Sequence, residues 1–180
     1  MKKITAILCV FTAVIFIFTS VCVKSENKVK IYFADRRLHM LVPSECSVYA
    51  ENSEEGAEKI ISVIENRNSN EIINLIPKNS GITVSVHNRT ACVDIPRTYK
   101  FPLAATKENE QLFIYQIVNS LTFADGIEYV TFTVGGKCKK RFLGFLDMRE
   151  IFSYRDTWFL VENISFCQFQ LPIEFLGIIC

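Results

Sequence analysis

The side chains with which this sequence could do chemistry are two histidines and a few scattered aspartates. His39 and His87 stand in no H-E-x-x-H motif and at no Cys/His spacing, so we expect both at turns or on the surface. A carboxylate pair that cleaves glycan would have to come from Asp35, Asp94, Asp125 and Asp147. These four fall at expected turns and strand edges. We therefore predict no catalytic, metal-binding or cofactor-binding residues.

Other functional motifs are missing too. The sequence has no G-x-S-x-G nucleophile motif and no phosphate-binding loop, and Gly135-Gly136 is expected to form a two-residue turn. Lys and Arg total 20 against 19 Asp and Glu, and no basic run is interleaved with aromatics. Nucleic acid is therefore not expected as a partner.

The seven cysteines do not form a recognisable scaffold. Cys9 and Cys22 fall in an apolar N-terminal segment, and no C-x-x-C pair occurs for zinc or redox chemistry. The other five cannot all pair with one another. We expect small apolar residues in strands, with one disulfide among Cys46, Cys92 and Cys138 as the alternative.

Residues 1–27 are interpreted as a membrane-directing segment with a short linker. Two lysines precede the uncharged run from Ile4 to Val23, which is long enough to span a bilayer as a helix. An uncleaved anchor is favoured. A cleaved secretion signal, and a lipoprotein signal with Cys22 as the lipid-bearing residue, are the alternatives. Each places the rest of the chain on the extracytoplasmic face of the membrane.

Residues 28–149 are predicted to form one domain. Val29, Ile31 and Phe33 alternate with polar residues in a first strand, and a second strand returns over Leu38–Val42 until Pro43 ends it. A helix follows, capped by Asn52 or Ser53, with apolar residues at helical spacing.

A second hairpin is predicted over Ile82–Ile95, turning at His87–Thr90, and is followed by a helix over Glu108–Phe123. Val130, Phe132 and Val134 then alternate in a strand, with Arg141–Met148 as a partner strand or extended arm. This order predicts an α+β two-layer sandwich, with two helices on one face of a mostly antiparallel sheet of five or six strands. Residues 150–180 read as an apolar extension of unknown structure.

Several stretches resemble the GerMN domain, a sporulation and spore-germination domain, over residues 28–148. They include KVKIYFAD, LHMLVP, EGAEKIISVIE and PKNSGITVSVHNRTACVDI, and the most specific is QIVNSLTFADGIEYVTFTVGGK. The matching signature positions are Asn119, Leu121, Thr122, Gly126, Gly136, Gly144 and Asp147. The chain departs from the family at Ser44, where a glutamate is frequent, and at Phe145, where the family often has histidine.

The resemblance implies a non-enzymatic domain similar to the ring-building modules of sporulation complexes. Its expected partners are envelope or sporulation proteins, the membrane through the N-terminal segment, and further copies of the chain. The residues themselves suggest a structural role for Asn119, whose amide is expected to bond the following loop and the free carbonyls of its helix. Tyr129, Thr131 and Thr133, on the polar sheet face, are the expected contact surface together with the sheet edges.

Two functions of other classes stay open. The first is a peptidoglycan-binding or wall-remodelling accessory protein, and the second is a secreted lipoprotein with a small-ligand pocket.

Overall fold

The computed structural model describes residues 26–37 and 39–156. The predictions of an N-terminal anchor, of Cys22 lipidation and of the apolar extension beyond residue 156 lie outside the described residues. Neither helix in the described part of the chain is long and apolar enough to cross a membrane.

The first sheet has the order β2-β1-β3. Strands β1 (Glu26–Asp35) and β2 (Leu41–Tyr49) form the predicted antiparallel hairpin, and the short β3 (Ile72–Ile73) pairs with the end of β1. The prediction that Pro43 ends the second strand is wrong, because β2 continues through it with Pro43 opposite Tyr32. An edge strand accepts proline, since the missing N–H can face away from the ladder. Leu41 is buried and Val42 exposed, so the prediction from alternation that Val42 shares the inward face with Leu38 and Met40 is wrong.

Helix α2 (Ser53–Asn66) begins as its sequence predicts. The Asn52 side chain caps it by accepting the N–H of Glu55 at 2.9 Å. Glu54 and Glu55 place negative charge in the first turn, where the helix dipole favours it. The buried face comprises Gly56, Ala57, Ile60, Ile61 and Ile64.

The second sheet has the order β4-β5-β6. Strands β4 (Thr83–His87) and β5 (Thr90–Ile95) form the second predicted hairpin, and both turn residues, Asn88 and Arg89, have positive φ, as a type I′ turn requires. Strand β6 (Tyr129–Val134) runs parallel to β5. A parallel pair needs a long crossover, and α3 (Lys107–Leu121) supplies it.

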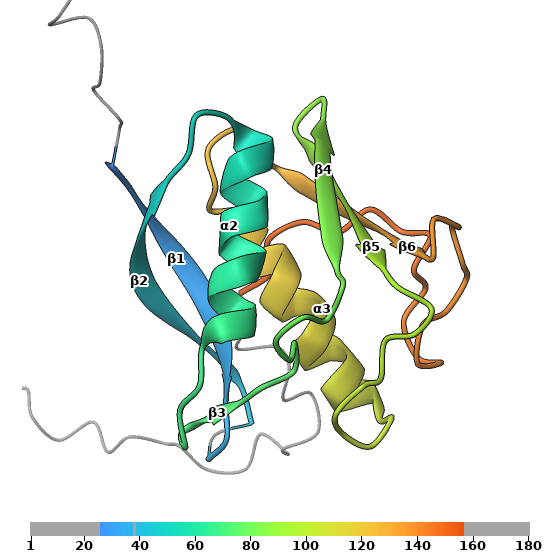
Figure 1. Ribbon diagram of the computed structural model, residues 1–180. Helices are drawn as coiled ribbons and strands as arrows, with labels where there is room; N and C mark the ends of the chain where they lie inside the picture. The colour runs from blue at the N-terminus through green and yellow to red at the C-terminus, as the bar shows by residue number, and fades with distance from the viewer. Residues whose placement is uncertain (1–25, 38, 157–180) are drawn as a thin grey trace, which may run out of the picture.

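The α+β class is confirmed, but the strands form two three-stranded sheets in place of one. The sheets lie on opposite sides of the helices in Figure 1, and each helix contacts both sheets. One backbone group of β1 is bonded by a helix side chain and not by a strand. The N–H of Tyr32 in β1 donates to Ser120 Oγ in α3 at 2.9 Å, and that hydroxyl donates to the carbonyl of Gln116 at 2.6 Å. Helix α3 thus satisfies a β1 backbone group that a further strand would otherwise bond.

The segment after β6 is an arm rather than a strand. Val134 bonds Lys137 across Gly135-Gly136, which confirms the predicted two-residue turn. Residues 141–148 then form turns and bends, and Phe142 stacks on Phe113 of α3 at 5.5 Å between ring centroids. Phe152 bridges Val130 through two backbone hydrogen bonds of 2.8 Å. The arm therefore covers part of the outer edge of β6.

Candidate interaction surface

The end of α3 holds three of the signature positions. Leu121 is fully buried, and the Thr122 hydroxyl donates to the Val118 carbonyl at 2.9 Å. Asn119 is also fully buried, but the prediction that its amide bonds the following loop and the free carbonyls of its helix is wrong. Its Nδ2 donates to the carbonyl of Arg155 at 2.8 Å, and its Oδ1 accepts the N–H of Arg155 at 3.1 Å. Asn119 therefore holds the C-terminal arm instead of the loop that follows its helix.

Two signature glycines occupy backbone conformations that other residues rarely adopt. Gly126 has φ +79°, in the left-handed region, in the turn after α3. A Cβ on Gly126 would lie 2.7 Å from Ser53 Oγ, so the Ser53 side chain at the start of α2 would have to shift to admit it. Gly136 has φ +71° with no neighbour within 4 Å of a Cβ, so its requirement is conformational alone.

Asp147 and Gly144 belong to the arm. Both Asp147 carboxylate oxygens bind the Arg149 guanidinium, and one also accepts the Arg149 backbone N–H. These bonds hold the pKa of Asp147 well below its usual range. Gly144 has φ +122°, with open space around a Cβ. Both residues thus shape the arm locally.

Glu110 is the principal polar residue that the sequence interpretation missed. It lies in the first turn of α3 with no exposed surface. Its carboxylate accepts the backbone N–H groups of Leu143, Phe145 and Leu146 at 2.8, 2.8 and 3.0 Å. A signal was present, because Glu110 falls four residues before Ile114 on the apolar stripe of the helix. A charge at such a position indicates a buried partner.

The aspartates and histidines considered above for catalysis or metal binding do not come together in a site within the described residues. Asp94 accepts the Thr133 hydroxyl at 2.6 Å and the Gly136 N–H at 2.7 Å. His39 and His87 are exposed, as predicted. In the described ranges, no three His, Cys, Asp or Glu residues gather as metal ligands would.

The described cysteines are free thiols. Cys46 lies in β2, Cys92 in β5, and Cys138 is exposed after the Gly135-Gly136 turn. The alternative of a disulfide among these three is therefore wrong.

One face of the second sheet is polar and partly exposed, and we call it the open face. Register and alternation define its members as Thr83, Ser85, His87, Thr90, Cys92, Asp94, Tyr129, Thr131 and Thr133. The three predicted contact residues all belong to it, with Tyr129 44% exposed. Thr133 is engaged by Asp94, which leaves Tyr129 and Thr131 as its outward-reaching members on β6.

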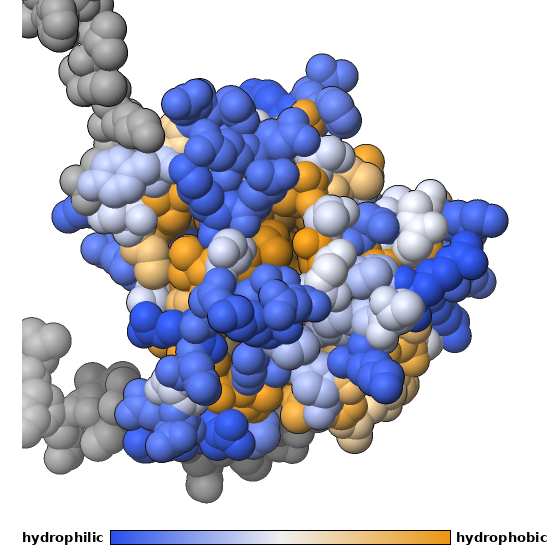
Figure 2. Space-filling view, in the orientation of Figure 1, coloured by the Kyte–Doolittle hydropathy of each residue, from blue (hydrophilic) through white to orange (hydrophobic). Residues whose placement is uncertain are grey.

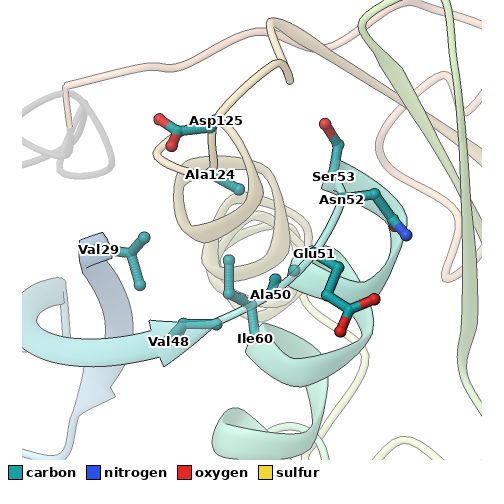
Figure 3. Close-up of a pocket in the computed structure, with 10 residues that line it drawn as sticks. Val29, Val48, Ala50, Glu51, Asn52, Ser53, Ile60, Ala124 and Asp125 are labelled. Carbon is teal, nitrogen blue, oxygen red and sulfur yellow. The ribbon is translucent and has the colours of Figure 1, made fainter. Parts of the chain in front are cut away.

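A small pocket lies where β1 and β2 meet the start of α2 and the Gly126 turn (Figure 3). Val29, Val48 and Ile60 form apolar walls, and Ser53 and Asp125 stand at the rim. Its volume is about 190 Å³, below the roughly 300–1,000 Å³ of most small-ligand pockets. A pocket of this size gives no support to the small-ligand function considered for a secreted lipoprotein.

Comparisons with known proteins agree with the fold. The tandem GerMN domains of the sporulation protein GerM from Bacillus subtilis superpose with a TM-score of 0.55 at 18% identity, covering 72% of this chain and 46% of that one. The first GerMN domain of the same protein superposes with a TM-score of 0.53 at 18% identity. The match covers 72% of this chain and 99% of that domain. This chain thus spans about half of the tandem structure. No curated protein matches it in sequence.

The family comparison identifies the chain. The model of the Germane family, described as sporulation and spore germination, matches residues 30–140. This range contains both described helices, the Gly135-Gly136 turn and every strand except the first four residues of β1. The chain belongs to the Germane family of sporulation and spore germination.

Proposed function

We propose that this chain is a non-enzymatic protein-interaction module of the bacterial cell envelope. It acts outside the cytoplasmic membrane, tethered by its N-terminal segment, and assists the assembly or localisation of a sporulation or spore-germination complex. The family match over residues 30–140 carries the proposal. The sporulation role stated for the Bacillus subtilis protein supports it, and we extend that role to this chain.

The open face supports an interaction role on physical grounds. Most of its side chains are small and uncharged, so covering them costs a partner less desolvation than covering charged side chains would. Asp94, its one carboxylate, already accepts two hydrogen bonds. Tyr129 is a suitable principal contact, because tyrosine combines a large apolar ring with a hydrogen-bonding hydroxyl and is enriched in interfaces. The proposed partners are envelope or sporulation proteins.

The test is genetic complementation in the bacterium that encodes the chain. A deletion strain should form fewer spores or germinate poorly, and the wild-type chain should restore it. Tyr129→Arg should fail to restore it, because it places a charge on the open face. Tyr49→Arg is the matched control, since Tyr49 on β2 is 42% exposed but belongs to the other sheet. Normal spores and germination in the deletion strain would contradict the proposal.

Sedimentation with purified peptidoglycan separates this function from the wall-accessory alternative. The proposed module should stay in the supernatant and leave the muropeptide profile unchanged. Co-sedimentation that depends on Tyr129, or an altered profile, would favour the wall function.

A further inference from the structure

Strand β4 is an edge strand without the usual protection. Edge strands commonly carry proline or charged residues that prevent pairing with other chains. Of the other outer strands, β2 follows this rule with Pro43 and Glu45, and the arm covers part of the outer edge of β6 through Phe152. Strand β4, with the sequence TVSVH, has no proline, lysine, arginine or carboxylate. Within the described ranges, it pairs only with β5.

The geometry of the hairpin shows which backbone groups face outward. His87 and Thr90 close a two-residue turn, so they form a hydrogen-bonded pair, and such pairs alternate along an antiparallel ladder. Ser85 therefore bonds toward β5. The N–H and C=O groups of Val84 and Val86 point away from β5, toward the unpaired edge. An added strand would find two donors and two acceptors there.

Helix α2 flanks this edge and forms a groove with it. The groove has a volume of about 210 Å³. Ile61, Ile82 and Val84 provide apolar lining, and Glu58 and Glu65 line it from α2. Figure 2 shows apolar surface in the gap between the polar surface of α2 and strand β4. Glu65 already accepts the Ser80 hydroxyl at 2.5 Å, whereas Glu58 lies exposed beside the groove.

We propose that this groove binds an extended segment of a partner protein in which apolar and basic side chains alternate. The segment adds to β4 as a further strand, bonding the backbone groups of Val84 and Val86. Its apolar side chains enter the groove, and its lysine or arginine side chains pair with the carboxylates of α2. This inference rests on the proposed interaction function and gives it a site and a class of partner.

Charge decides against occupants from the chain itself. Residues 157–180 contain no lysine or arginine and include Glu162 and Glu174, so the extension does not complement an acidic groove. A second copy pairing β4 with β4 would bring two acidic α2 surfaces together. The uncharged run from Ile4 to Val23 supplies no alternating basic residues. A segment of another protein fits the charge better than any of these.

A synthetic peptide tests the proposal. The probe is a ten-residue peptide of alternating valine and lysine, blocked at both ends, titrated into the full chain in mild detergent. We expect saturable binding with a dissociation constant below about 1 mM. A valine and glutamate peptide of the same length is the charge control, and it should not bind.

Backbone amide exchange reports the mode of binding. Without peptide, the Val84 and Val86 amides should exchange faster than the Ser85 amide, and saturating peptide should slow both. Glu58→Lys should weaken binding by about fivefold, because a groove carboxylate becomes a like charge. Glu45→Lys, the same change on the β2 edge, should leave binding unchanged.

Three results would overturn the inference. They are no binding of the valine and lysine peptide, unchanged exchange at Val84 and Val86 when it is bound, and slow exchange at both before peptide is added. Complementation separates this failure from failure of the proposed function. If the deletion strain is defective and Glu58→Lys restores it fully, the module function stands and the groove is not its site.

Discussion

The side-chain amide of Asn119 pairs with both backbone groups of Arg155, with the donated bond at 2.8 Å and the accepted bond at 3.1 Å. The contact joins the last turn of α3 to the arm, 36 residues later in the chain. Because Asn119 bonds the backbone groups of residue 155, the contact fixes the path of the arm whatever side chain is present at that position.

Asn119→Ala should release the end of the arm. The change leaves buried polar groups without partners, so we expect a loss of about 1–3 kcal/mol in the free energy of unfolding. Urea denaturation measures this, and faster amide exchange at Arg155 locates it. Asn68→Ala, at an exposed position, is the control. Equal stability of the two variants would contradict the role given to Asn119.

Glu110→Gln should destabilise the arm from its other end. A glutamine places an NH₂ group against backbone N–H donors, so at least one of the three bonds is lost. Hydrogen bonds to charged groups contribute about 1.5–3 kcal/mol, and we expect a loss of that size. Thermal or urea denaturation at pH 7 checks it. The exposed neighbour Glu108→Gln should change little, and an equal effect of both would show that Glu110 does not anchor the arm.

Gly126→Ala should cost more than Gly136→Ala. Both positions have similar positive φ, +79° and +71°, but only a Cβ at 126 meets Ser53 Oγ. The left-handed conformation alone costs a non-glycine residue about 1–2 kcal/mol, and the clash adds to this at 126. Denaturation of both variants gives the difference. Adding Ser53→Ala should recover part of the loss at 126 and none at 136, and a strictly additive double mutant would refute the clash.

Stability should fall at alkaline pH because of Tyr32. Burial first, and then its contacts with Tyr154, raise the pKa of Tyr32 above its ordinary value of about 10. The unfolded chain therefore loses this proton at lower pH than the folded chain. The stabilisation is complete below about pH 10, and declines above it by up to about 1.4 kcal/mol per pH unit.

Tyr32→Phe should reduce this decline. The decline is measured as the change in the free energy of unfolding between pH 9 and 11, for the variant and for the wild type. Tyr129→Phe, at an exposed ring, is the control. Identical slopes for wild type and Tyr32→Phe would contradict the assignment.

Local patterns in the sequence determined most elements of this fold. The alternation around Val130 and Phe132 predicted β6, and the apolar spacing of Ile60 and Ile64 predicted α2, with its cap narrowed to Asn52 or Ser53. The two-residue turn at Asn88 and Arg89 followed from the strands on either side. Each of these features depends on neighbours within a few residues, which is why periodicity and turn chemistry reveal it.

Only the tertiary structure decided how these elements combine. Pro43 stays inside a strand because β2 is an edge, and the strands divide into two sheets, with Ser120 of α3 bonding the backbone of Tyr32 in β1. Glu110 and Asn119 bind backbone groups more than 30 residues away in the chain. Every residue has such backbone groups, so the sequence does not indicate which of them a side chain will bind. The proposed groove likewise exists because α2 packs beside β4. Long-range contacts of this kind are set by packing, which local sequence patterns do not specify.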